Sequence, residues 1–356
     1  MSASANRADL AFYPWHVRVW EQLGASLLAD RFPHALLFEG QSGTGRNAFA
    51  TTLARILLCD LSEPNDAAVC ASCKSCDLLT AGSNPDFLSV YPEEKGKSLG
   101  IDQIRRAIDF ANKTSALGKG KVIVISPAES MTRGASNALL KCLEEPSSGT
   151  VLILVSKPGA FIPATIRSRC QRWVLPAPTH EQTAAWLRDE LPELGSATLN
   201  EWMHLCPARP IDIKGLVVSD SGEHWLALHR ALAAAGAQHS QDASSVANSI
   251  AMIGAKLSID EYLDLFESRL QALIKGGALD EAGHGPGRSV GHVGHVGHVG
   301  REHESMDDWE YSRKRQAFHV LDELRALRLA HAGGSNPQAD LLKFNLARQL
   351  MALGER

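Results

Sequence analysis

The sequence lacks the long apolar runs that mark membrane proteins. A bilayer-spanning helix requires roughly 20 apolar residues, whereas the longest runs here, such as 122–125 and 151–155, have the length of strands. The first 20 residues contain Arg7, Asp9 and Arg18 and no apolar core of a signal peptide. We therefore expect a cytoplasmic protein with no membrane partner.

The chain also lacks an excess of positive charge. It has 36 Lys and Arg against 40 Asp and Glu, a net charge of -4 over 356 residues. Proteins that bind nucleic acid unaided are usually basic, so any DNA contact is expected to be local or shared with partner chains. The 44% hydrophobic and 21% charged residues are typical of folded domains and exclude wholesale disorder. The length allows two or three domains.

Cysteines are few, and four of the seven lie close together. Cys59, Cys70, Cys73 and Cys76 follow the spacing C-x10-C-x2-C-x2-C. Cytoplasmic thiols stay reduced, so a cluster indicates metal binding rather than disulfides. Four thiolates suit tetrahedral Zn²⁺ in a closed, structural site, and an iron–sulfur cluster is the chemical alternative. The isolated cysteines are predicted to be buried or half-buried thiols, at Cys142, Cys170 and Cys206.

Strand and helix patterns alternate between residues 35 and 175. The alternation predicts an α/β fold with a five-stranded parallel sheet covered by helices on both faces. The fully apolar strands fit, because both of their faces would be buried. The predicted strands are 35–39, 86–91, 121–126, 151–155 and 172–175, and the predicted helices are 46–59, 101–113, 135–144 and 160–168.

The remainder of the chain reads as helical. Pro176 and Pro178 interrupt the sheet region, helices are predicted at 181–190 and 199–205, and Ala/Leu-rich helices at 224–235, 243–257, 259–275, 305–332 and 338–353. We predict a core domain at 1–176, with the cysteine cluster in 59–76, a small helical domain at 177–219 and an all-helical domain at 220–356.

One segment, 283–300, contains Gly-His-Val three times in tandem and is predicted to be a disordered insertion. The alternative is a metal site, for which imidazoles are suited, formed by His284, His292, His295 and His298.

The segment Gly40-Gln41-Ser42-Gly43-Thr44-Gly45-Arg46-Asn47 stands between a strand and a helix, as a phosphate-binding P-loop does. Gly40, Gly43 and Gly45 fit. Arg46 occupies the lysine position, and Arg-for-Lys is not conservative. Asn47 replaces the Mg²⁺-binding hydroxyl. The strand 121–125 runs into Ser126-Pro127 without the acidic pair of an active ATPase, and Glu129 is expected to be a solvated helix-start acid. We predict a degenerate core that does not bind ATP.

Several motifs in this order resemble the bacterial DNA polymerase III clamp-loader family of the AAA+ superfamily. They are Pro14-Trp15, Asn84-Pro85-Asp86, the run NALLKCLEEP at 137–146 and IRSRC at 166–170. The dense match covers about residues 12–176. The resemblance implies an AAA+ core with an inserted zinc module, a helical lid at 177–219 and a collar at 220–356 that assembles a ring.

The resemblance also implies a function. The family opens a sliding clamp and closes it around primer–template DNA, and the implied partners are the tau or gamma ATPase subunits and the delta subunit. Within the family the chain is most similar to the subunit that combines a zinc module with a decayed nucleotide site, so no intrinsic ATPase activity is expected. Arg169 of the Ser-Arg-Cys motif is the implied arginine finger, acting in trans on a neighbour's ATP.

Two alternatives stay open. The chain is an ATP-binding or ATP-hydrolysing subunit if Arg46 serves as a phosphate ligand. It is an independent zinc-dependent DNA-binding protein if it binds DNA alone, against which its net charge argues. The helix start near Ser136 and Asn137 could contact DNA phosphates through its free N–H groups. The alternative is that this helix start is capped and faces solvent. Arg209, between two prolines, is interpreted as part of a helix start rather than as a nucleotide ligand.

Overall fold

A computed structural model describes residues 12–29, 31–60, 70–94, 97–219 and 222–227, with further helical positions between 230 and 349. Contacts divide the chain into two units, residues 1–215 and 216–356. No helix in the described residues is both long and apolar enough to span a bilayer. The cysteine cluster, the phosphate loop and Arg169 all lie in the first unit.

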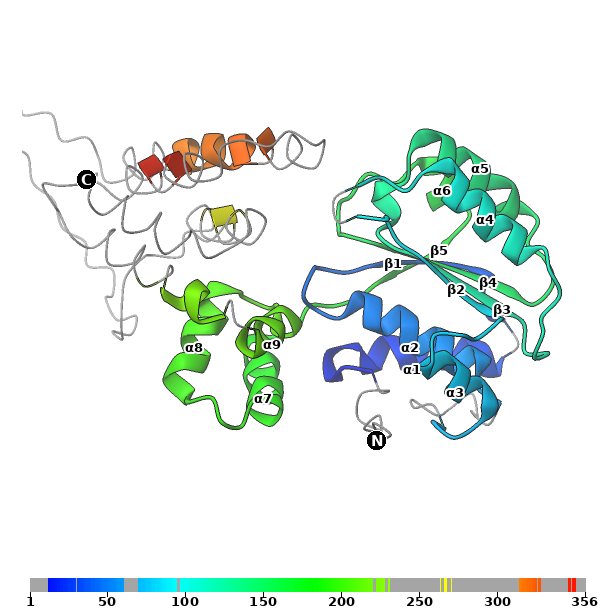
Figure 1. Cartoon of the computed structure of the whole chain (residues 1–356), viewed down its shortest axis with the longest axis horizontal. Coiled ribbons are helices and arrows are strands. Elements are labelled where there is room, and N and C mark those ends of the chain that lie inside the picture. The colour runs from blue at the N-terminus through cyan, green and yellow to red at the C-terminus, as the bar shows by residue number, and fades with distance from the viewer. Residues whose placement is uncertain are drawn as a thin grey trace, which may run out of the picture. The chain divides into compact units, whose positions relative to one another are not determined.

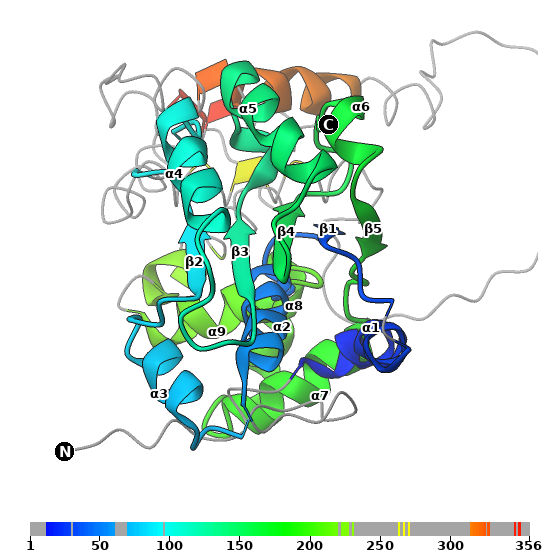
Figure 2. The same cartoon turned by 90° about the vertical axis from the view of Figure 1, so that its right-hand side faces the viewer.

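The predicted five-stranded parallel sheet is confirmed. Its strands, in the order β2-β3-β4-β1-β5 (Figure 2), are all parallel. Each observed strand end lies within one residue of the predicted end. The strands that lie inside the sheet are buried, and the edge strands β2 and β5 are partly exposed. The bounds are β1 Ala35–Glu39, β2 Phe87–Val90, β3 Lys121–Ile125, β4 Thr150–Ser156 and β5 Gln171–Val174.

Helices cover both faces of the sheet (Figure 1). Because successive side chains of a strand point to opposite faces, Leu36 and Phe38 of β1 pack in the core beneath α1, α2 and α3, and Ala35 and Leu37 pack beneath α4, α5 and α6. The bounds are α1 Val17–Leu28, α2 Arg46–Leu58, α3 Lys74–Thr80, α4 Ile101–Ala111, α5 Arg133–Glu144 and α6 Ala164–Arg167.

Several helix boundaries differ from the prediction by two residues or more, and the local sequence explains two of these differences. Helix α5 begins two residues early, at Arg133, because the Thr132 hydroxyl caps it by accepting a hydrogen bond from the Ala135 N–H at 3.2 Å. Ser136, expected near the helix start, is therefore inside the helix and buried. Helix α6 is only four residues long and begins four residues late, at Ala164, because Pro163, immediately before it, has a non-helical ψ of 136°.

Helices α7 (His180–Glu190), α8 (Ser196–Leu205) and α9 (Pro210–Val218) follow the sheet, and α7 and α8 contain the helices predicted there. Thr179 and Gln182 form a reciprocal capping box at the start of α7. The described positions from 222 onward are all helical. The predicted helix 243–257, the 283–300 segment and its histidines lie outside the described residues. The domain boundaries near 176 and 219 stay predictions.

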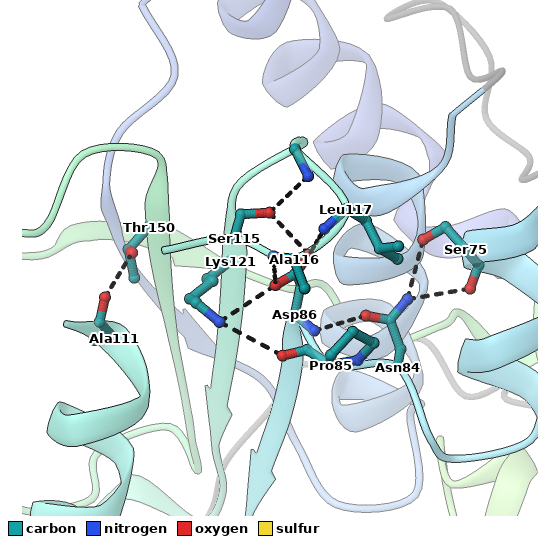
Figure 3. A network of polar contacts seen from close by, with 11 residues as sticks. Ser75, Asn84, Pro85, Asp86, Ala111, Ser115, Ala116, Leu117, Lys121 and Thr150 are labelled. Carbon is teal, nitrogen blue, oxygen red and sulfur yellow. Dashed lines mark hydrogen bonds and ion pairs between the residues drawn. The ribbon is translucent and has the colours of Figure 1, made fainter. Parts of the chain in front are cut away.

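A buried ion pair anchors the amino-terminal ends of β2 and β3 (Figure 3). Asp86, just before β2, is fully buried and lies 3.2 Å from Nζ of Lys121, the first residue of β3. Its carboxylate also accepts hydrogen bonds from the Ser115 hydroxyl at 2.8 Å and from the N–H groups of Ala116 and Leu117 at 2.8 and 2.7 Å. The aspartate of the Asn-Pro-Asp motif therefore orders the loop that leads into β3.

The asparagine of the same motif connects the sheet to α3. The Asn84 side-chain amide donates to the carbonyl and the hydroxyl of Ser75, at 3.2 and 3.0 Å, and its oxygen accepts from the Asp86 N–H at 2.9 Å. Ser75 lies between two of the clustered cysteines. The motif thus has a structural role, holding the cysteine-bearing helix against the start of β2.

Candidate functional site: a closed phosphate loop, a cysteine cluster and an exposed arginine

The phosphate loop lies where the topology of the sheet favours a ligand. The chain runs from β1 to β2, β3 and β4 on one side of β1 and then crosses from β4 to β5 on its other side. In open α/β sheets ligands bind at such a reversal of strand order, beyond the carboxyl ends of the strands. The Gly40 N–H donates to the Ser156 carbonyl at 3.2 Å, which joins the loop to the end of β4. Gly43 and Gly45 have positive φ, +73° and +88°, a conformation that favours glycine.

The cation of the loop is turned back onto the loop itself. Arg46 Nη1 donates to the Gly40 carbonyl at 2.7 Å. Burial lowers the pKa of Arg46, and the nearby carboxylates of Glu129 and Asp212 act in the opposite direction. The guanidinium therefore satisfies a backbone carbonyl of its own loop and faces two acidic groups of its own chain.

The neighbouring positions offer no arrangement for Mg²⁺. The Ser126 hydroxyl, at the end of β3, donates to Asn47 Oδ1 at 2.8 Å, so the side-chain oxygen that could replace a hydroxyl is already engaged. Glu129 lies in a short 3-10 helix, Ala128–Ser130. The prediction of a helix-start acid is confirmed for Glu129, but the side chain is only partly solvated, because one of its oxygens is buried and has no hydrogen-bond partner among the described atoms.

The start of α9 packs directly on the loop. The Ile211 N–H donates to the Gly43 carbonyl at 3.1 Å, and a Cβ added to Gly43 would lie 2.4 Å from Asp212 Oδ2. Arg209 Nε donates to the same carboxylate at 2.7 Å. The interpretation of Arg209 as part of a helix start agrees with the structure, since α9 begins at Pro210.

Aromatic side chains cover the other side of the loop. The Trp15 indole N–H donates to the Thr44 carbonyl at 2.8 Å, and a Cβ on Gly45 would lie 2.2 Å from the Tyr13 ring. Tyr13 and Trp15 stack at 5.0 Å, and the Trp186 ring meets both edge to face. The Pro14-Trp15 motif thus places an indole against the phosphate loop.

The four clustered cysteines converge. Their sulfurs all lie within 4.8 Å of one another, and three of the separations are 3.3 Å (Cys59–Cys70), 3.7 Å (Cys70–Cys76) and 3.9 Å (Cys59–Cys73). Sulfurs around a tetrahedral zinc ion, with Zn–S of about 2.3 Å, stand about 3.8 Å apart. None of the cysteines forms a disulfide. The donor set and its spacing therefore fit a metal ion.

Local electrostatics differ among these thiols. Burial raises the pKa of Cys76 and of Cys73. Burial acts in the same direction on Cys70, but hydrogen bonds with the backbone of Ser72 and Cys73 and with the neighbouring thiols outweigh it and lower the pKa of Cys70 to about 6. A cation among the four sulfurs would favour the thiolate form of each.

The three remaining cysteines agree with their interpretation as isolated thiols. Cys142 and Cys206 are buried and Cys170 is half-buried, where burial raises its pKa to about 12.

Arg169 lies just after α6 with 34% of its side chain exposed. Nη1 donates to the Thr165 carbonyl at 2.8 Å, and Nη2 pairs with Glu144 Oε1 at 2.5 Å. No contact between Arg169 and the phosphate loop occurs among the described residues. The cysteine cluster is also remote, because it lies beyond the far end of the 13-residue helix α2, about 20 Å along its axis from the loop.

Two acidic residues at these sites are absent from the sequence-based set. Asp212 contacts the phosphate loop from α9, and its only sequence signal is its position three residues after Arg209. Glu144 pairs with Arg169 from α5, and its signal is an acid at the end of a helix, a position that the helix dipole disfavours.

Comparison with known proteins identifies relatives of the first part of the chain. Residues 15–179 match the family described as "DNA polymerase III, delta subunit". DNA polymerase III subunit delta' of Pseudomonas aeruginosa is 40% identical over 205 residues, which cover 57% of this chain and 61% of that protein. The Escherichia coli subunit delta' is 36% identical over 182 residues, 51% of this chain and 54% of the relative. The chain thus spans little more than half the length of these relatives, and the matches confirm the resemblance predicted from the motifs.

A solved structure is similar over almost the whole chain. The gamma subunit-related protein of DNA polymerase III from Thermotoga maritima superimposes with a TM-score of 0.51 over 94% of this chain and 99% of that one, at 16% sequence identity. At this identity the similarity concerns the fold alone.

Proposed function

We propose, from the kinship of its N-terminal half with delta' subunits of bacterial DNA polymerase III, that this chain is a non-catalytic subunit of a clamp loader. It assembles with tau or gamma ATPase subunits and a delta subunit into the ring that loads a sliding clamp onto primed DNA. It contributes Arg169 to the ATP site of a neighbour. Its core, lid and collar correspond to residues 1–176, 177–219 and 220–356.

The contacts that the phosphate loop makes within the chain support the proposal that this subunit is non-catalytic. The Arg46 guanidinium bonds to the Gly40 carbonyl at 2.7 Å instead of standing free for a phosphate. Two carboxylates near this cation would repel a polyphosphate. Asn47 Oδ1 is engaged by Ser126. These contacts support a subunit that neither binds nor hydrolyses ATP.

The position of Arg169 supports the proposal that it acts on ATP bound by a neighbouring subunit. Arg169 makes no contact with the phosphate loop in the described residues, so it is not organised to act on a nucleotide of its own chain. Its side chain is one-third exposed, which leaves it open to contact with a second molecule. An arginine supplied from outside stabilises charge on a transferring γ-phosphoryl group, with effects of several orders of magnitude in rate.

The cysteine cluster is proposed to be a structural zinc site. All four ligands come from protein thiols, which leaves no open coordination position for a substrate or a reactive water. When bound, the ion would cross-link the end of α2 to α3. Cys59 supplies a ligand from the α2 end, Cys70 precedes α3, and Cys73 and Cys76 stand at its start.

The experiment compares ATP turnover by the chain alone and by the reconstituted loader. We expect no ATP binding and no turnover by the isolated chain. In the assembled complex, Arg169→Ala should lower DNA-stimulated turnover by at least about tenfold at the site it serves, because the transition-state charge loses a partner. The measurement is steady-state phosphate release with primer–template DNA present.

The matched control is Arg167→Ala, which removes an exposed arginine two residues before Arg169, at the end of α6. It should leave turnover within about twofold of the wild-type rate. Unchanged turnover in a correctly assembled Arg169→Ala complex would refute the finger. Tight ATP binding with turnover by the chain alone would instead establish the ATP-hydrolysing alternative.

A further inference from the structure

We infer that Glu144 is a positioning residue for Arg169, an inference that rests on the proposed function in trans. The two side chains come from different elements, since Glu144 is the last residue of α5 and Arg169 follows α6. Their charged atoms, Glu144 Oε1 and Arg169 Nη2, are 2.5 Å apart. The two residues are 25 positions apart in the sequence, and their spacing does not predict that they are in contact.

The contact fixes the direction of the guanidinium. Arg169 Nη1 donates to the Thr165 carbonyl at 2.8 Å and lies 3.4 Å from the Ser168 hydroxyl, both on the α6 side. Glu144 holds Nη2 from the α5 side. A long side chain held at both terminal nitrogens has lost most of its rotamer freedom before it meets a phosphate. The Nε–H has no partner among the described residues and is available to an incoming oxygen.

Fold stability does not account for an acid at this position. The two side chains are 34% and 49% exposed, and ion pairs at such exposure contribute little to folding. Glu144 also ends α5, where the negative end of the helix dipole disfavours a carboxylate. The position is therefore better explained by what the carboxylate does to Arg169 than by its effect on the helix.

Positioning is expected to matter for the rate, because an arginine finger acts only when its charge is placed against the charge that develops in the transition state. A displacement of about 1 Å at a reacting centre is enough to change rates strongly. Removing the Glu144 charge leaves Arg169 present but unrestrained on one side. The loss should consequently be smaller than the loss on removing Arg169 itself.

The test measures the part of the reconstituted loader's ATP turnover that depends on Arg169, namely the wild-type rate minus the Arg169→Ala rate. Glu144→Gln should reduce this part by about 3- to 10-fold in kcat with KM unchanged. Glu144→Asp, which keeps the charge, should restore much of it. Glu145→Gln is the matched control, because it removes the same charge from the adjacent exposed residue, and it should leave the rate within about twofold.

A double variant separates positioning from other roles. In the Arg169→Ala background, Glu144→Gln should cause no further loss, because residues that act as one unit are not additive. A further loss there, or failure of Glu144→Gln to assemble by size-exclusion chromatography, would overturn the inference and make Glu144 an interface residue. If Arg169→Ala lowers turnover and Glu144→Gln does not, the positioning role of Glu144 is refuted and the proposed finger stands. If Arg169→Ala itself has no effect, the proposed finger fails.

Discussion

Individual charged residues serve two distinct purposes in this molecule, and burial separates them. Asp86 and Lys121 are almost completely buried and satisfy each other and the surrounding donors. Lys121 also lies over the Phe110 ring, 4.1 Å from its centroid. Arg169 and Glu144 are paired in water at the surface. The buried pair is suited to hold the fold, whereas the partly exposed pair is accessible to a second molecule.

The first residue-scale prediction concerns the buried pair. Asp86→Ala should lower the free energy of unfolding by about 3–5 kcal/mol, because it leaves the Lys121 ammonium buried without its partner. Urea unfolding followed by tryptophan fluorescence measures the change. Glu94→Ala is the control, since it removes an exposed partner of Lys97 and should change stability by less than about 1 kcal/mol. Equal effects of the two substitutions would contradict the anchoring role.

The same contacts set a pH dependence. Burial alone would raise the pKa of Asp86, but the Ala116 and Leu117 N–H groups, the Ser115 hydroxyl and Lys121 outweigh it and lower the pKa below its ordinary 3.8. A carboxyl group with a lowered pKa in the folded state stabilises the protein above its unfolded pKa, and this stabilisation is lost as the pH falls through the folded value. The stability difference between wild type and Asp86→Ala should therefore narrow below pH 3.8.

At the scale of elements, helix α2 connects two sites with different chemistry. Its amino end carries Arg46 of the phosphate loop, and Cys59 follows its carboxyl end. Helix α3 has only seven residues and is too short to be stable by itself. Its stability therefore depends on its surroundings: the Asn84 contacts with Ser75, the cysteine cluster and the packing of Leu79 in the core.

Cys76→Ser tests this dependence. It should reduce bound zinc from about one ion per chain to nearly none and expose α3, because a structural zinc site contributes directly to the folding of its segment. Elemental analysis gives the metal content, and amide hydrogen exchange should rise in residues 70–80 but not in β1 or β3.

Cys170→Ser, outside the cluster, is the control and should keep the metal. Zinc that persists after Cys76→Ser would remove Cys76 from the ligand set. If the purified protein contains iron and inorganic sulfide, the cluster holds an iron–sulfur centre and not zinc.

Elements were predictable from the sequence where apolar patterning decides them. The strands β1 and β3 are fully apolar or nearly so and are buried on both faces, which is why their ends were predictable within one residue. Helix α3 was not predicted, since its seven residues, Lys74–Thr80, are too few to show a clear apolar periodicity. The short α6 and the early start of α5 depend on Pro163 and on the Thr132 cap, local effects that override the apolar pattern.

The sequence identified the residues of the candidate site but not the side chains that contact them. The loop glycines, Arg46, the cysteines and Arg169 stand in recognisable motifs. Their partners come from distant elements: Asp212 reaches the loop from α9, and Glu144 reaches Arg169 from α5. Tertiary packing determines where these two side chains point, and the spacing of residues in the sequence does not encode it. The contacts of Asp212 and Glu144 could therefore not be predicted.

At the scale of the whole molecule, net charge determines what the chain can do alone. A polyanion is bound mainly through released counterions, which requires a surface with several unpaired basic groups. The chain carries a net charge of -4. Several of its basic side chains in the described residues, including Lys121, Arg169 and Arg172, are paired with carboxylates. The molecule is therefore expected to contact DNA only as part of a larger assembly.

The corresponding prediction is that the isolated chain binds primer–template DNA no more tightly than about 10 µM near physiological salt, the range of non-specific binding. Fluorescence anisotropy of labelled DNA over a salt series provides the measurement. The reconstituted loader of the proposed function is the comparison, and it should bind the same DNA more tightly if its other subunits supply basic groups. Submicromolar binding by the chain alone, weakening steeply with salt, would show that a local basic surface outweighs the net charge and would favour an independent DNA-binding protein over a clamp-loader subunit.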